Sequence, residues 1–141
     1  MFDAATTYGL RLQLAETLLD IGELMRAKEL FTESLKPGTT HSPGGVARDA
    51  RAIYGMAQVH FGLAQYDNAL PLFNEVFQTT KKGSHLWWEA LLYDLRCRTE
   101  LQHPADGIIR SIRQHKYLDR EMGGDNLRRQ FDTLLTVNER R

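Results

Sequence analysis

The residues with the most reactive side chains in this sequence are one cysteine and five histidines. Cys97 lies between Arg96 and Arg98, and flanking cations can lower the pKa of a thiol and make it nucleophilic. No histidine stands one helical turn away to serve as a base, so a structural thiol is the favoured interpretation. The histidines form no i, i+4 pair and no HExxH motif; they are His41, His60, His85, His103 and His115. We therefore expect no enzyme activity, no catalytic residue, no metal and no cofactor.

Two further features could bind an anion. Gly44-Gly45 precede a predicted helix, but without a GxGxxG or GK[ST] motif a turn or hinge is favoured over an anion site. The last third is locally basic through Arg110, Arg113, Lys116, Arg120, Arg128 and Arg129. Acidic residues interleave with them, namely Asp106, Asp119, Glu121, Asp125 and Asp132. A solvated face or a docking surface for an acidic partner is favoured, and nucleic-acid binding is kept as an alternative.

The dipeptide Trp87-Trp88 is the most conspicuous apolar feature. Adjacent residues of a helix point about 100° apart, so both rings are not expected to face one core. We expect Trp88 in the core and Trp87 as cover for a neighbouring helix end. The alternative is that Trp87 is exposed as an anchor for a partner protein.

Composition and charge point to one globular domain. The chain has 141 residues, of which 42% are hydrophobic, and this is enough for one sizeable core. Eighteen Lys and Arg balance eighteen Asp and Glu, so no strong overall field draws the chain to nucleic acid or to an anionic membrane. The single cysteine excludes an intramolecular disulfide and fits a reducing compartment. Because neither a signal peptide nor a long apolar run is visible, we expect a cytoplasmic location and no membrane partner.

Helices are the elements that must position these side chains. Glycine and proline fall between segments with apolar residues at three- and four-residue steps, and no convincing β-alternation is present. The expected helices cover residues 7–21, 24–35, 46–63, 66–80, a stretch after the N-cap Ser84, a stretch beginning at Pro104, and 125–140 with Asp125 as its cap. The segment from residue 39 to residue 45 is expected to be a loop.

The first two expected helices and the next two carry an internal repeat. Ala15, Gly22, Leu24, Ala27 and Phe31 have the same spacing as Ala57, Ala64, Tyr66, Ala69 and Phe73. Small residues twelve positions apart let two antiparallel helices approach closely, and the aromatic four positions later fills the space before the next pair. We expect these ten residues to be the repeat-packing positions.

This pattern of small and aromatic positions resembles the tetratricopeptide repeat (TPR) family. The resemblance implies an all-α fold, an α-solenoid of about three antiparallel helix pairs with a C-terminal capping helix, in a single domain over residues 1–141. Repeat 1 would cover about 8–37, an insertion loop 38–45, and repeat 2 about 46–80. A degenerate repeat 3 would cover about 86–116 and the capping helix about 125–140. In repeat 3 only Gly107 obeys the pattern, because Leu95, Pro104 and Ser111 occupy the small, aromatic and phenylalanine positions.

The resemblance also implies a concave face, lined by the first helix of each pair, that binds a peptide or a partner protein. Carried over by position, its residues would be Leu12, Glu16, Leu19, Arg51, Tyr54, Gln58, Phe61, Glu89, Leu92 and Arg96. Family members that grip the C-terminal carboxylate of chaperones use Lys and Asn at some of these positions. Here Leu12, Glu16, Glu89 and Tyr93 occupy them, so a chaperone tail is not expected as the ligand.

The expected function is therefore a non-catalytic protein-interaction module, part of a larger protein. One alternative is a homo-oligomerisation module, in which the open ends of a short solenoid pair with another copy. The other is nucleic-acid binding through the basic last third.

Overall fold

The structure, a computed structural model, describes residues 3–36 and 49–141. Within these residues it contains seven helices and no strand, so the all-α expectation is confirmed. The helices are α1 (Ala4–Asp20), α2 (Leu24–Ser34), α3 (Ala50–Gly62), α4 (Tyr66–Thr79), α5 (His85–Glu100), α6 (Ala105–Leu118) and α7 (Asp125–Glu139). The expected insertion loop, Gly44-Gly45 and the expected start of the third helix lie outside the described residues.

Side-chain caps explain where several helices begin. Ser84 caps α5 as predicted, its Oγ accepting a hydrogen bond from the Trp87 backbone N–H at 3.3 Å. Asp49 caps α3 through the Arg51 N–H, and its other oxygen accepts from the Tyr8 hydroxyl of α1 at 2.9 Å. The expectation for Asp125 was wrong, because Gly124, at φ 115°, is the N-cap and Asp125 is the first helical residue.

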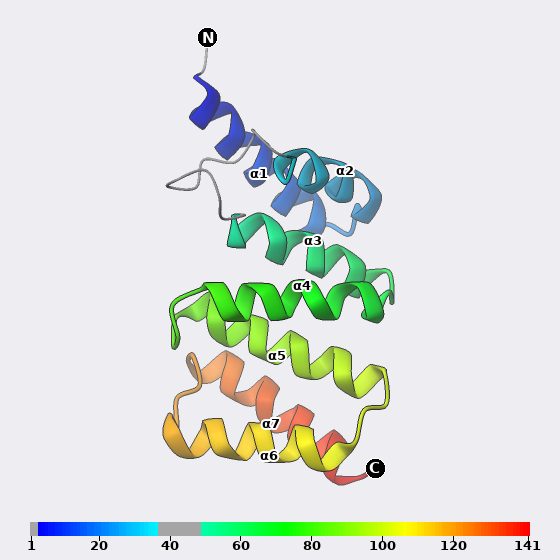
Figure 1. The fold of residues 1–141 in the computed structure, drawn as a ribbon, viewed down its shortest axis with the longest axis vertical. Helices are drawn as coiled ribbons and strands as arrows, with labels where there is room; N and C mark the ends of the chain where they lie inside the picture. Colours follow the sequence, from blue (N-terminus) through cyan, green and yellow to red (C-terminus); the bar gives the residue numbers. More distant parts are fainter. Residues whose placement is uncertain (1–2, 37–48) are drawn as a thin grey trace.

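Consecutive helices from α1 to α5 pack against one another in chain order (Figure 1). The last two helices depart from that order. The α7 helix packs against both α5 and α6 and lies between them in Figure 1. The α5 helix has fewer contacts with α6 than with α7. The α1 helix consequently lies at one end of the long axis, and α6 and α7 lie at the other.

The turns between α1 and α2, α3 and α4, and α5 and α6 share one hydrogen-bond geometry. Gly22, Ala64 and Gln102 each follow the C-cap residue with a left-handed backbone, at φ 85°, 58° and 60°. In each turn the next residue's N–H bonds a carbonyl five positions back: Glu23 to Leu18, Gln65 to His60, and His103 to Arg98. This is the Schellman motif, which satisfies carbonyls that a helix end leaves free.

The matched alanines and phenylalanines lie in the core. Ala15 of α1, Ala27 of α2 and Phe31 share one buried cluster and are all 0% exposed. Ala57 of α3 and Ala69 of α4 are buried in a second cluster with Phe73, also at 0% exposure. An alanine at each of these crossings leaves room for the neighbouring helix.

Each of the two phenylalanines also contacts the helix pair that follows. A Cβ added at Gly55 of α3 would lie 2.2 Å from the Phe31 ring, so that glycine is the recess into which Phe31 packs. Phe73 stacks on Tyr93 of α5, with ring centroids 5.3 Å apart and an interplanar angle of 21°. Gly55 and Tyr93 occupy the same position of the repeat, two residues before Ala57 and Leu95.

Two of the ten expected packing positions have a different role. Gly22 and Ala64 are exposed, so the expectation that they pack between helices was wrong, and what they share is the left-handed turn conformation. Leu24 is half-buried against Gly62, and Tyr66 is half-buried with its ring edge-on to Phe61 at 5.3 Å.

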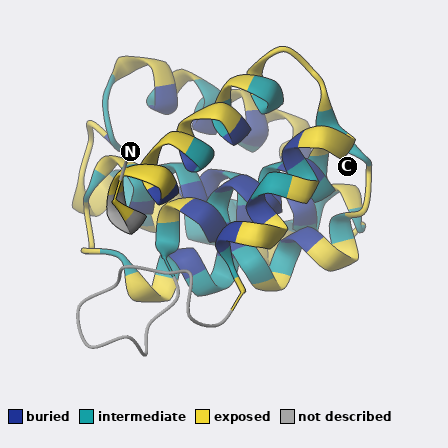
Figure 2. Ribbon diagram, turned by 90° about the horizontal axis from the view of Figure 1, so that it is seen from above, coloured by how far each residue is buried: buried dark blue, intermediate teal, exposed yellow. Residues whose placement is uncertain are grey.

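The α5 helix is the most completely buried element. Its buried residues lie on several sides of the helix, and Figure 2 shows buried segments wherever helices face one another. Trp87 and Trp88 are 5% and 3% exposed and belong to one cluster. Phe77 of α4 stacks on Trp87 at 4.8 Å, and Phe131 of α7 meets Trp88 edge-on at 6.0 Å. The expectation that the two rings would not face one core was wrong, because α4 and α7 cover α5 on different sides and both rings belong to one buried cluster. An exposed Trp87 anchor is excluded in this structure.

Candidate partner-binding face

Side chains of α1 meet those of α3, and side chains of α3, α5 and α7 line one pocket; the surface that these contacts define is here called the odd-helix face. Arg51 of α3 donates through Nε to a Glu16 oxygen of α1 at 2.7 Å, and its second guanidinium nitrogen pairs with the other oxygen. Arg96 of α5 donates to the Gln130 side-chain oxygen of α7 at 2.8 Å. These contacts connect helices that are not neighbours in the chain, and they keep polar groups at the surface.

An aromatic cluster joins α3, α4 and α5 beneath this face. Tyr93 lies 5.1 Å from Phe61 and 6.3 Å from Tyr54, in both cases edge-on. The Arg96 guanidinium carbon lies 4.9 Å from the Tyr93 ring centre, within cation–π range. Gln58 donates a hydrogen bond to the Tyr54 hydroxyl at 2.6 Å. Rings fixed in this way offer rigid contact area at little cost in conformational entropy.

Electrostatics at the cluster favour neutral phenol groups. Burial, with the nearby Glu89 carboxylate as a further cause, raises the pKa of the Tyr54 hydroxyl. Glu89 is partly exposed and pairs with His85 one turn earlier on α5. Tyr54 therefore stays a hydrogen-bonding hydroxyl throughout the physiological range.

A pocket of about 260 Å³ opens between α3, α5 and α7. Its apolar lining comes from Phe61, Leu134 and Val137, and Val137 is 46% exposed. Arg96, Glu100 and Gln130 bring polar groups to the same pocket. An apolar floor with charged neighbours suits an apolar side chain flanked by polar groups.

The structure distributes the ten residues expected on the concave face among three environments. Leu12 and Leu92 are buried, at 2% and 0% exposure, so neither presents surface to a partner and both expectations are wrong for this structure. They face the core because packed helices cover them on that side. Leu19 is half-buried in the N-terminal cluster. The other seven lie on or just beneath the odd-helix face: Glu16, Arg51, Tyr54, Gln58, Phe61, Glu89 and Arg96.

Sequence reasoning missed three contributors to this face. Tyr93 was noted only as a departure from the chaperone-binding pattern, yet its ring joins Tyr54, Phe61 and Phe73. Gln130 and Val137 belong to α7, which was expected to serve as a cap. Their spacing with Leu134, at three- and four-residue steps, is the signal that puts them on one side of that helix.

The cysteine is buried, and several basic residues of the last third form ion pairs. Cys97 is 0% exposed, and burial together with the Asp94 carboxylate raises its thiol pKa to about 12, opposite to an activated nucleophile. Three of the basic residues of the last third form ion pairs, namely Lys116 with Asp132 at 2.8 Å, Arg128 with Asp125 at 3.1 Å, and Arg113 with Glu139 at 3.5 Å. These pairs match a solvated mixed-charge face.

Residues 3–36 and 49–141 contain no group of three or more His, Cys, Asp or Glu that could hold a metal ion. In the same part of the chain, no helix combines the length and apolar character needed to cross a bilayer. Comparison with protein-family models, with curated proteins and with solved structures found no match to the chain.

Proposed function

We propose that this chain is a TPR-like α-solenoid that binds another polypeptide on its odd-helix face and catalyses no reaction. Three hairpins with one turn geometry support the repeat, as do two hairpins whose crossing alanines and phenylalanines are equally buried. Repeats of this kind stack so that alternate helices share a surface, which is where a partner binds. A cytoplasmic location, inferred from the single cysteine, belongs to the same proposal.

The observation that carries the proposal is the pocket between α3, α5 and α7. Its lining joins three alternate helices, its floor is apolar, and Val137 stands exposed within it. Anchoring of a partner's apolar side chain in such a pocket, with charged groups around it, is the usual source of binding energy in peptide recognition. A partner segment lying across Arg96 and Glu100 would add polar contacts.

The test compares two substitutions of exposed apolar residues. Val137→Asp adds a charge to the pocket, whereas Leu118→Asp adds the same charge on α6 at a residue that is 76% exposed and not part of this pocket. We expect partner capture from a native extract to fall about tenfold or more with Val137→Asp and to be unchanged with Leu118→Asp. Circular dichroism establishes that both variants are folded.

A photo-crosslinking residue at position 137 then locates the contact directly. Crosslinks to the captured protein from position 137, with none from position 118, are the expected result. Equal capture by both Asp variants, or crosslinks from position 118 alone, would exclude the odd-helix face as the binding surface.

A second candidate is self-association through the outer side of α1. Leu10 and Leu14 on that helix are 45% and 52% exposed, and Ile21, just after it, is 68% exposed. Grouped apolar side chains at an exposed end are typical of contact surfaces. Sedimentation across a dilution series tests this candidate against a Leu14→Lys, Ile21→Lys variant. A wild-type chain that stays monomeric at high concentration removes it.

A further inference from the structure

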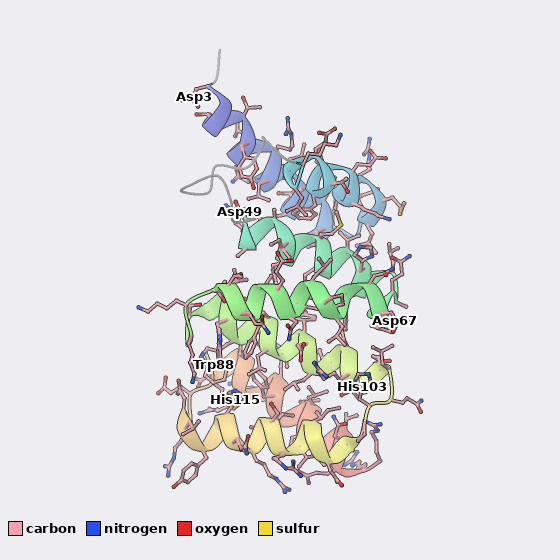
Figure 3. All side chains as sticks on the ribbon, viewed as in Figure 1. Asp3, Asp49, Asp67, Trp88, His103 and His115 are labelled. Carbon is pink, nitrogen blue, oxygen red and sulfur yellow. The ribbon has the colours of Figure 1, made fainter. Side chains whose placement is uncertain are left out.

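A second, larger pocket lies between α4, α5 and α6, on the other side of α5 from the odd-helix face. Its volume is about 490 Å³, within the range of about 300–1,000 Å³ typical of small-ligand sites. Phe77, Leu91, Leu95 and Ile108 give it apolar walls. In Figure 3, His103 and His115 mark two points of its lining on the side of α6, and α4 crosses above.

The pocket exists because the third hairpin departs from the repeat. Gly107 and Ser111 hold the positions at which α4 carries Ala69 and Phe73. No heavy atom lies within 4 Å of a Cβ built on Gly107, and Ser111 is only half-buried. A phenylalanine-sized volume is thus missing from α6, and both residues line the pocket that results.

Two opposite charges belong to this pocket. Asp94 of α5 accepts a hydrogen bond from Nε of Arg98 through Oδ2 at 2.9 Å, and the Asp94 side chain is 10% exposed while that of Arg98 is 36% exposed. Among buried side-chain polar atoms of the described residues, Oδ1 of Asp94 is the one without a partner in hydrogen-bonding geometry, although the Asn74 amide lies close enough to oppose the rise in the pKa of the Asp94 carboxyl. Leaving a buried carboxylate oxygen unpaired is unfavourable, and a ligand that brings a donor to it recovers that loss.

The charge pair selects the head group of a ligand. A cationic head gains from Asp94 but is repelled by Arg98, and an anionic head meets the reverse balance. A zwitterion gains from both, because its positive end can lie at the buried carboxylate and its negative end at the more exposed guanidinium, whose terminal N–H groups are oriented by the Asp94 bond.

We propose that this pocket binds an apolar α-amino acid as its zwitterion, with the ammonium group at Asp94, the carboxylate at Arg98 and the side chain along the apolar walls. Asn74 of α4 is half-buried beside the Asp94 carboxyl, and a rotation of its side chain opens the approach to Oδ1. The site is independent of the odd-helix face: the pocket residues Leu91, Leu95 and Arg98 project from the opposite side of α5 to Tyr93 and Arg96.

Intrinsic fluorescence provides the readout. The chain has two tryptophans, and both rings lie within 6.0 Å of the His115 ring that lines the pocket, while Phe77 stacks on Trp87. We would titrate the protein with L-leucine and with four relatives: N-acetyl-leucine, leucine amide, N-acetyl-leucine amide and glycine. The first three change the charges of the head group, and glycine removes the side chain.

Saturable binding of leucine, with each relative about tenfold or more weaker, is the expected result. Equal affinity for the zwitterion and the neutral diamide would overturn the role of the charge pair. A dissociation constant of about 10 mM corresponds to a binding free energy of only about 3 kcal/mol. If leucine does not saturate the protein up to that concentration, the proposed site is overturned.

Two variants tie the signal to the pocket. Asp94→Asn keeps the side-chain shape and should weaken leucine binding about ten- to a hundredfold. Gly107→Leu fills the pocket from a position with free space around its Cβ, so it should fold and abolish binding. Arg110→Ala, an exposed change on α6 outside this lining, is the matched control. Unchanged leucine affinity in a folded Gly107→Leu protein would refute the proposal.

Discussion

Of the three hairpin turns, one has a glycine at the residue with left-handed backbone and the other two have residues with a side chain. Gly22 adopts it at φ 85°, whereas Ala64 and Gln102 adopt it at 58° and 60° with a Cβ present. For residues other than glycine this conformation costs about 1–2 kcal/mol. Two of the three turns therefore retain local strain that the surrounding packing must offset.

We expect Ala64→Gly and Gln102→Gly each to stabilise the fold by about 0.5–1 kcal/mol, because the relief of strain exceeds the entropy that glycine adds to the unfolded chain. Urea unfolding measures the change, and the midpoint of thermal unfolding should rise by roughly 2–4 °C. The matched opposite change, Gly22→Ala, should destabilise by a similar amount. A loss of stability on Ala64→Gly would show that its Cβ contributes packing instead.

Asp94 makes stability depend on pH. Burial, the largest cause, raises the pKa of its carboxyl above the ordinary 3.8, although Arg98 opposes the shift. The folded state thus binds the proton more tightly than the unfolded state does. Asp94 lowers the free energy of unfolding as pH rises from 3.8 through its folded pKa, and the full cost is present above that pKa.

The variant Asp94→Asn removes this titration. We expect Asp94→Asn to be more stable relative to the wild type at pH 7 than at a pH near 3.8. The difference should shrink on acidification because the folded wild type then binds a proton at Asp94 and no longer buries a charged carboxylate. Denaturant unfolding at a series of pH values checks the trend. A relative stability that increases on acidification would mean that the Arg98 bond outweighs the cost of burial.

At the scale of elements, the glycine with the least space for a side chain among those described lies where α3 packs on α2. A methyl group at Gly55 would lie 2.2 Å from the Phe31 ring, so Gly55→Ala forces α3 away from α2 or Phe31 out of its position. We expect the free energy of unfolding to fall by about 1–3 kcal/mol, as is typical of an overpacked core, and urea unfolding measures the change.

Gly9→Ala in α1 is the control, since nothing lies within 4 Å of its added Cβ. That change should stabilise by about 0.5–1 kcal/mol through helix propensity alone. Equal effects of the two changes would contradict the proposed helix contact.

The elements could be predicted from the sequence more fully than the site. Apolar periodicity and breakers are local signals, and they located the helices and the alanine crossings such as Ala57 with Ala69. Burial of Trp87 depends on Phe77, a residue of another helix, and no local pattern carries that contact. The Arg96–Gln130 bond likewise joins residues 34 positions apart. Of the residues predicted for the candidate face, Leu12 and Leu92 are buried, while those that lie on or beneath it come from α1, α3 and α5. The contribution of α7 was not predicted.

In the whole molecule, the side chains of α5 are the most completely buried, and those of α1 are more exposed. The α5 helix is covered by α4, α6 and α7, whereas α1, among the described helices, packs mainly against α2 and α3 and exposes Leu10 and Leu14. We expect the amides of α5 to exchange with solvent slowest, at the rate of global unfolding, and those of α1 to exchange faster through local opening. Hydrogen-exchange mass spectrometry on the intact chain measures both. Equal protection of α1 and α5 would indicate a single cooperative unit, or a covered α1.

The two ends of the molecule also differ in how they are closed. The buried Asn138 of α7 donates a hydrogen bond to the Thr99 hydroxyl of α5 at 3.1 Å, and Arg141 donates to the His103 carbonyl at 2.8 Å, whereas α1 exposes Leu10 and Leu14. To lengthen this protein, an extra hairpin would therefore be fused upstream of α1, because the exposed apolar side chains of α1 offer a surface for it to pack on. The same addition at the other terminus would have to keep or replace the hydrogen bonds of Asn138 and Arg141.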